Sequence, residues 1–157
     1  MLFLSEYEHS IDEKQRLAIP AEVRDVLGSA GQSTALVAAP GSNGALWLWP
    51  EVTFAQLAEE LQSSLLGHED LEEFVRWLFS QAARLVLDSA GRIRIPDRLL
   101  TQHSLSGNVT LIGVRDHLEL LTPASWANER DRLEPSRNEI WRRAREAIAQ
   151  RRKDSTS

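Results

Sequence analysis

The chain contains no cysteine among its 157 residues. Disulfide bonds and thiolate metal sites are therefore excluded, and a cytoplasmic location is permitted. The sequence also lacks any apolar run close to the roughly 18 residues that a membrane-spanning helix requires, so no membrane partner is expected. Its first residues, MLFLSEYEH, form too short an apolar stretch and turn acidic too soon to predict a secretory signal.

Basic residues are scarce over most of the chain. The net charge is −5, which disfavours indiscriminate binding to nucleic acid. Residues 1–126 hold 9 Lys and Arg against 17 Asp and Glu, a balance of −8, whereas residues 127–157 hold 9 against 6, a balance of +3. Any nucleic-acid surface on residues 1–126 must therefore be local, with a few arginines gathered on one face.

The sequence does contain an internal repeat. Residues 10–20 read SIDEKQRLAIP, and residues 86–96 read VLDSAGRIRIP. The identical positions share one separation of 76 residues and are Asp12 and Asp88, Arg16 and Arg92, Ile19 and Ile95, and Pro20 and Pro96. Ile11 and Leu17 return as Leu87 and Ile93, so the apolar pattern is kept as well. Each copy therefore carries one Asp-x-x-x-Arg turn.

The same order of elements follows in both copies. Each predicts a strand, a turn, a strand, a short helix that opens at a proline, and two further strands. We interpret this as a tandem duplication of one unit, at residues 6–52 and 82–126. A unit of about 45 residues cannot bury an adequate core alone. The sequence therefore predicts an α+β fold in which two pseudo-symmetric units interleave their strands.

Helices are predicted outside the two units. Residues 53–81 form a linker of two helices, which we expect to cover the open side of the core. Thr53 is expected to cap the first helix, which carries the apolar stripe Phe54, Leu57, Ala58, Leu61 and Leu65 and ends at Gly67; the second carries Leu71, Phe74, Val75, Leu78 and Phe79. The tail at 127–157 is helical from Pro123, interrupted near Pro135, with a stripe at Ile140, Trp141, Ala144, Ala147 and Ile148. The last residues, RRKDSTS, are expected to lie outside the ordered helix.

The Asp-x-x-x-Arg turns have two interpretations. In the structural one, Asp12 and Asp88 organise their turns by accepting backbone N–H bonds and pairing with the arginine four residues on. In the functional one, Arg16, Arg92 and Arg94 stand on the strands after the turns, pointing away from the apolar face. With Lys14 at one loop tip, these side chains form a candidate surface for phosphates and guanine edges in a DNA groove.

Other candidate sites are weaker. His9, His68, His103 and His117 are scattered without metal-ligand spacing, so surface or core histidines are the better interpretation. Glu6 and Glu8 alternate on one strand as a solvated face. The tryptophans at 47, 49, 77, 126 and 141 all fall in strand or helix patterns that favour packing over base stacking. The sequence predicts no catalytic residue, no metal site and no cofactor.

Several motifs together resemble a known family. EYEHSIDEKQRLAIPAEVR, ALWLWP and LVLDSAGRIRIP, at their spacing over about residues 5–130, resemble the MraZ family of bacterial transcriptional regulators. The resemblance implies two SpoVT-AbrB-type units in a double-split β-barrel-like core, and assembly into ring-shaped homo-oligomers. It further implies a cytoplasmic, nucleoid-associated protein that binds repeated promoter sites at the division and cell-wall gene cluster and usually represses its own operon. The family's DNA-contacting arginines match Arg16 and Arg92.

The chain also departs from the family pattern. It reads FLSEY where the family commonly has Arg-Gly before the first strand, and it has Gln15 where the family usually has glycine. The arginine-bearing tail after Pro135 extends beyond the resemblance. A rival hypothesis is an antitoxin-like or interaction scaffold that binds another protein, which the acidic body and the Trp-bearing tail would fit. An enzyme would need a cluster of titratable residues, which the sequence does not indicate.

Overall fold

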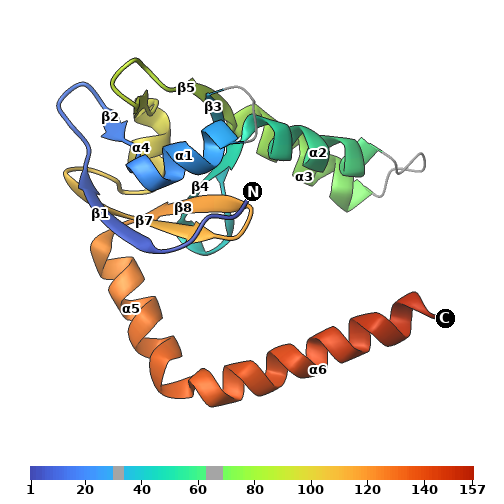
Figure 1. Ribbon diagram of the computed structural model, residues 1–157. Helices are drawn as coiled ribbons and strands as arrows, with labels where there is room; N and C mark the ends of the chain where they lie inside the picture. Colours follow the sequence, from blue (N-terminus) through green and yellow to red (C-terminus); the bar gives the residue numbers. More distant parts are fainter. Residues whose placement is uncertain (30–33, 63–68) are drawn as a thin grey trace. The chain divides into compact units, whose positions relative to one another are not determined.

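The computed structural model describes residues 1–29, 34–62 and 69–157. It divides into two compact units, Met1–Pro123 and Ala124–Ser157. The first copy of the repeat comprises β1 (Glu6–Ser10), β2 (Arg16–Ala18), α1 (Ala21–Ser29), β3 (Ala35–Pro40), η1 (Ser42–Gly44) and β4 (Leu46–Pro50). The second comprises β5 (Ala83–Val86), β6 (Arg92–Arg94), α4 (Asp97–Gln102), β7 (Asn108–Val114) and β8 (His117–Leu121). The α+β class and the duplicated order of elements are confirmed (Figure 1).

The strands of the two copies are interleaved. A six-stranded antiparallel sheet has the order β1-β7-β8-β4-β3-β5, and β2 pairs with β6 in a separate two-stranded ribbon. In the large sheet, β1, β3 and β4 of the first copy correspond to β5, β7 and β8 of the second. Replacing each strand by its counterpart gives the same strand order read from the opposite edge of the sheet. The ladders β1–β7, β2–β6, β3–β5 and β4–β8 all join one copy to the other. The copies thus share one sheet about a pseudo-two-fold axis, while the predicted repeat boundaries, 6–52 and 82–126, stay a prediction.

The main core lies between the large sheet, the ribbon and the helices α1 and α4 (Figure 1). Leu17 of β2 and Ile93 of β6 pair directly with each other on the pseudo-two-fold axis, and both are fully buried. Each is the counterpart of the other, so the axis passes through one apolar pair. Phe3 also joins this core, through a β-bridge to Arg115. Nothing in the repeat indicated that contribution from the N-terminal residues.

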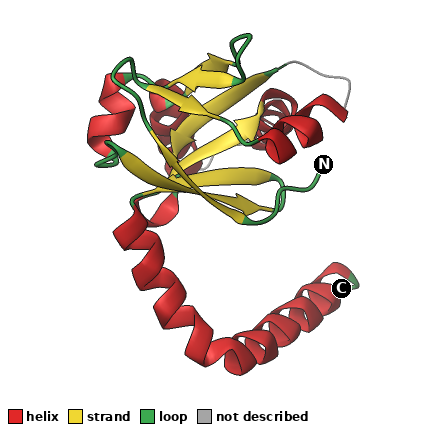
Figure 2. Ribbon diagram, turned by 60° about the vertical axis from the view of Figure 1, so that its left-hand side comes forward, coloured by secondary structure: helices red, strands yellow, loops and turns green. Residues whose placement is uncertain are grey.

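A smaller apolar cluster lies on the opposite face of the sheet. Alternate residues of a strand point to opposite faces, so β3 sends Leu36 and Ala38 into the main core and Val37 and Ala39 into this second cluster. The helices α2 (Glu51–Gln62) and α3 (Glu69–Gln81) lie side by side and cover it (Figure 2). The predicted helical pair therefore covers a face of the sheet, chiefly over β3 and β4.

Two details of the helical pair differ from prediction. The helix α2 begins at Glu51, so the prediction that Thr53 caps it is wrong. The Glu51 carboxylate pairs with Arg84 of β5, with 2.6 Å between Nε and Oε1, and an acid in the first turn suits the helix dipole. In α3 only Leu78 of the predicted stripe is buried, whereas Phe74 and Phe79 are exposed. Leu65 and Gly67 lie outside the described residues.

The second unit is helical throughout. It consists of α5 (Pro123–Leu133), the 3-10 turn η2 (Glu134–Ser136) and α6 (Arg137–Ser155), so the predicted interruption at Pro135 is confirmed. The helix α6 includes residues 151–155, so the prediction that RRKDSTS lies outside the helix is wrong except for Thr156 and Ser157. Hydroxyl groups at the end of the chain donate to the carbonyl oxygens of Arg152 and Lys153, which satisfies acceptors in the last turn. Within the described part of the chain, no helix has the length and apolar content to cross a membrane.

Candidate nucleic-acid interface

Asp12 organises the turn that precedes β2. Its Oδ1 accepts the backbone N–H groups of Lys14 and Arg16, both at 2.9 Å. Its Oδ2 accepts the Nε–H of Arg16 at 2.7 Å. The backbone N–H of Asp12 donates to the carbonyl oxygen of Arg16 at 3.0 Å. One carboxylate therefore closes the turn and holds the arginine that follows it.

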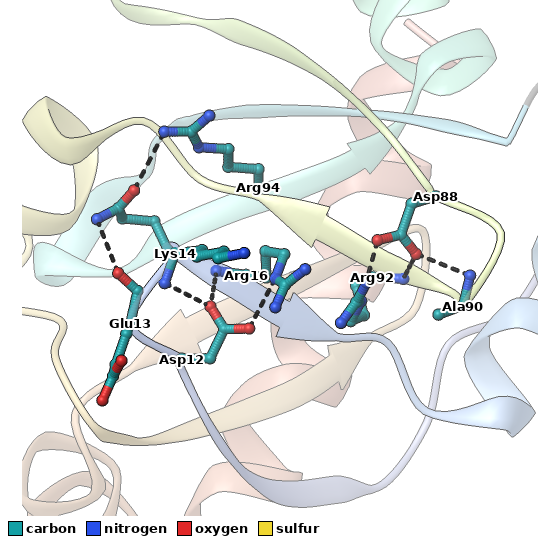
Figure 3. A network of polar contacts seen from close by, with 9 residues as sticks. Asp12, Glu13, Lys14, Arg16, Asp88, Ala90, Arg92 and Arg94 are labelled. Atoms are coloured by element: carbon teal, nitrogen blue, oxygen red, sulfur yellow. Dashed lines mark hydrogen bonds and ion pairs between the residues drawn. The ribbon is translucent and has the colours of Figure 1, made fainter.

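The second turn repeats this arrangement atom for atom (Figure 3). Oδ1 of Asp88 accepts the backbone N–H groups of Ala90 and Arg92, both at 2.9 Å. Oδ2 accepts the Nε–H of Arg92 at 3.0 Å. The two Asp–Arg pairs therefore have the same geometry, and Figure 3 shows them on neighbouring strands.

The turns are also tied to each other. The last residue before each strand has a positive φ, 59° at Gln15 and 75° at Gly91. The carbonyl oxygen of Gly91 accepts the N–H of Ile19, and that of Gln15 accepts the N–H of Ile95, both at 2.9 Å. Each turn is thus bonded to the strand of the other copy. Gln15 adopts a backbone conformation that glycine occupies at less cost.

The arginines share one face of the β2–β6 ribbon. Arg16 lies directly opposite Arg94, and Arg92 lies directly opposite Ala18. Opposite residues, and residues two apart on a strand, point to the same side. All four positions therefore face away from the buried pair on the axis. Lys14 is exposed at the tip of the first turn. The predicted DNA-binding side chains thus lie on one ribbon and its adjoining turn.

The ion pairs set the charge state of this face. The pKa of Asp12 is lowered chiefly by the backbone N–H of Arg16, against an opposing effect of burial, and further by the Arg16 guanidinium. The pKa of Asp88 is lowered in the same way by Arg92. Each ion pair uses Nε–H, one of the five N–H donors of a guanidinium. No group of the described residues accepts from the Nη atoms of Arg16 or Arg92, which leaves these donors for a ligand.

Arg24 is a further cation at this site, which the reasoning from sequence missed. It comes from α1 of the first copy, yet its side chain lies across Gly91 in the turn of the second copy. A Cβ on Gly91 would stand 2.7 Å from Cδ of Arg24. Its Nε donates to the carbonyl oxygen of Ile19 at 3.1 Å. One feature of the sequence could have pointed to Arg24: the equivalent position in the second copy is Leu100, which is buried.

His117 forms a separate polar cluster in β8. It is buried, with Nδ1 2.8 Å from Oδ1 of Asp116 and Nε2 3.0 Å from Oε1 of Glu119. Its ring stacks on Trp47, with centroids 4.3 Å apart. Burial acts to lower the pKa of His117, but the two carboxylates outweigh it and raise the pKa. Among the described residues no group of three or more His, Asp or Glu side chains is placed to hold a metal ion. His68 lies outside them.

Fold and site together define a class of protein: a duplicated α+β chain whose intertwined halves present two matching Asp–Arg turns on one ribbon. A family model described as "MraZ protein, putative antitoxin-like" matches residues 2–76 and 78–147. The chain belongs to the MraZ family. The match extends past residue 130, where the resemblance of the motifs ends, so it includes most of the helical tail.

Curated relatives carry the name "Transcriptional regulator MraZ". The protein from Roseiflexus castenholzii is 39% identical over 127 residues, covering 81% of this chain and 85% of its own length. The protein from Heliobacterium modesticaldum is 32% identical over 139 residues, covering 88% and 94%. The protein from Alkaliphilus metalliredigens is 33% identical over 145 residues, covering 92% and 98%. A transcriptional regulator is not an enzyme class.

Proposed function

We propose that this chain is a sequence-specific DNA-binding transcriptional regulator. The observation that carries the proposal is the β2–β6 ribbon, on which Arg16, Arg92 and Arg94 share the face opposite the core. Family membership and the name of the relatives support the same function. The Asp–Arg turns combine both interpretations of the motif, because the aspartates organise the turns and thereby aim the arginines.

The ribbon suits the major groove of DNA. That groove admits a two-stranded β-ribbon, and arginine can donate two parallel bonds to O6 and N7 of guanine. The Nε–H of Arg16 and Arg92 is held by aspartate, so each guanidinium is oriented before DNA arrives and offers its Nη donors. Lys14 and Arg24, at the margins of the ribbon, would contact phosphates, which set register without reading sequence.

Repetition would supply the affinity that one chain lacks. With a net charge of −5, a single copy can offer DNA only a few arginines. Linking several copies makes each later contact intramolecular and multiplies affinity. We therefore propose a ring-shaped homo-oligomer that binds repeated sites in its own promoter, at the division and cell-wall gene cluster, and represses it. The proposal includes a cytoplasmic location and association with the nucleoid.

The test is gel retardation of the DNA upstream of its own gene by Arg16→Ala and Arg92→Ala. A lost bidentate contact costs about 1–3 kcal/mol, so we expect promoter affinity to fall roughly 5- to 150-fold at a single site. The melting temperature should stay near that of the wild type, because the bonds from the backbone N–H groups to Oδ1 of each aspartate remain when the arginine side chain is removed.

Arg132→Ala is the matched control, since it removes one exposed cation from α5. It should leave promoter binding unchanged. Arginine variants that melt normally and retain full affinity for the promoter would remove the DNA-reading role. The hypothesis of an antitoxin-like or interaction scaffold without a DNA role would then lead.

A further inference from the structure

An exposed aromatic patch lies on α3. Phe74 and Trp77 are 43% and 46% exposed, although both are large apolar side chains. They border an apolar groove of about 450 Å³, which is also lined by Pro40, Trp47, Trp49 and Leu57. The groove therefore lies between the helical pair and the β3–β4 hairpin. Apolar surface of this kind marks a site of association.

Acidic side chains flank the patch. Asp70 precedes Phe74 by four residues and Glu73 precedes Trp77 by four, so all of them lie on one side of α3. Both acids are exposed. We call these four residues the α3 surface. It combines two aromatic rings with two negative charges. A complementary partner surface would be apolar and positively charged.

The helix α6 has the opposite character. Trp141 and Ile148, seven residues or two turns apart, are 67% and 53% exposed. Arg145 follows Trp141 by four residues and Arg152 follows Ile148 by four, so all four lie on one side. We call them the α6 surface. No ion pair to Arg145 or Arg152 is found in the described part of the chain, and α6 contains no buried residue.

Two glutamates of α6 are paired on another side of the helix. Arg142 pairs with both Glu139 and Glu146, one turn before and one turn after it. These three residues point away from Trp141 and Ile148. Glu139 and Glu146 are therefore paired outside the α6 surface, which keeps its positive charge.

We propose that the α6 surface of one copy docks on the α3 surface of a second copy, with Trp141 and Ile148 over the apolar groove. The charges match in sign, and an amphipathic helix in an apolar groove is a recurrent mode of recognition. Each copy would offer one helix and accept another. Such a head-to-tail contact closes into a ring when its rotation permits. The inference rests on the proposed homo-oligomer and identifies its contact.

Reciprocal charge reversal tests the contact. One variant carries Asp70→Lys and Glu73→Lys, and the other carries Arg145→Glu and Arg152→Glu. Alone, each brings like charges together, and light scattering at micromolar concentration should show the 17.7 kDa monomer. Mixed in equal amounts, the unchanged helix of the first variant meets the unchanged α3 surface of the second, and the reversed helix of the second meets the reversed α3 surface of the first. Both contacts are complementary, so the mass should return to that of the wild type.

Matched reversals outside the two surfaces serve as controls. Glu72→Lys and Lys153→Glu change charge on the far sides of α3 and α6 and should leave the mass unchanged. A chain with all four reversals restores complementarity within one sequence and should assemble again, which separates a lost contact from a lost fold.

The possible failures are distinguishable. A wild-type oligomer that neither reversal disrupts would overturn the α6–α3 contact and leave the homo-oligomer standing. Single variants that dissociate but do not recover on mixing would overturn docking between copies. A wild-type protein that is only monomeric would overturn both the contact and the proposed ring. DNA reading by Arg16 and Arg92 would remain to be decided by retardation of a single site.

Discussion

At the scale of single residues, the two carboxylate oxygens of Asp12, and likewise those of Asp88, have different roles. Oδ1 of Asp12 accepts backbone N–H bonds and fixes the turn, while Oδ2 holds the Nε–H of Arg16. Removing the carboxylate therefore frees both the turn and the arginine. Removing the arginine leaves the bonds between Oδ1 and the backbone intact.

We predict that Asp12→Ala and Asp88→Ala lower the melting temperature and that promoter binding falls as a consequence. The folded-state pKa of each aspartate is lowered, so its contribution to stability is present above the unfolded-state pKa of about 3.9 and is lost as pH falls through the folded value. Melting curves from pH 7 to pH 2 should therefore show the gap to the wild type closing in acid. Asp25→Ala, on the exposed side of α1, is the control.

Two results would contradict this role of the aspartates. Aspartate variants that melt like the wild type at pH 7, yet lose promoter binding, would mean that the carboxylates do not organise the turns. A gap that stays constant down to pH 2 would show that the ionised carboxylates are not its source.

Sequence could identify the residues of the ribbon, because the repeat marks them twice. It could not place Arg24 beside Gly91, since the two are 67 positions apart and meet only when the copies interleave. His117 is a similar case. The charges of Asp116 and Glu119 were visible in the sequence, but their closure around one buried ring depends on β8 and the stacking of Trp47.

At the scale of elements, the order of strands and helices could be predicted, since the two copies supply the same pattern independently. Helix ends could not, because contacts that the periodicity does not show accompany them. The helix α2 begins at Glu51, which pairs with Arg84 of β5, and α6 continues to Ser155, whose hydroxyl donates to the carbonyl oxygen of Arg152. Periodicity in α3 marked an apolar side without showing what covers it, so the exposure of Phe74 was unforeseen.

The ribbon itself yields a prediction about stability. Leu17 and Ile93 are both fully buried and directly opposite each other, so each truncation to alanine should cost about 2–5 kcal/mol of unfolding free energy. The double variant should cost less than the sum, by about 0.5–3 kcal/mol, because the two truncations open one shared cavity. Urea denaturation measures all three. Leu57→Ala, half-buried in α2, should cost less. Additive losses would show that the axis pair is not a single packing unit.

At the scale of the whole molecule, the distribution of charge constrains how DNA can be held. Residues 1–126 carry −8, so the arginine-bearing ribbon is a small positive region on a negative body. Random DNA would be repelled by most of this surface. Specific contacts, repeated along the duplex, would have to outweigh that repulsion.

We therefore predict that affinity rises steeply with the number of sites. Promoter fragments with two or more intact repeats should bind about 10²–10⁴-fold more tightly than a fragment with one, as expected for linked contacts. Retardation at fixed salt measures this, since the affinity of a charged contact depends on ionic strength. The matched control is a fragment of equal length with the extra repeats scrambled. Equal affinity for one and several repeats would contradict multivalent binding.

The interleaving of the strands also bears on how the protein is made. When β4 leaves the ribosome, the β3–β4 hairpin is the one ladder of the described residues whose two strands are both present, because β1, β2 and β4 also pair with β7, β6 and β8 of the second copy. At a synthesis rate of about 5–20 residues per second, roughly 4–15 s pass between the synthesis of β4 and that of Leu121, the last residue of β8. During that time its apolar strands lack cover and are available to chaperones. Folding is thus tied to completion of the second copy, because a product truncated before it lacks the strands that pair with β1, β2 and β4.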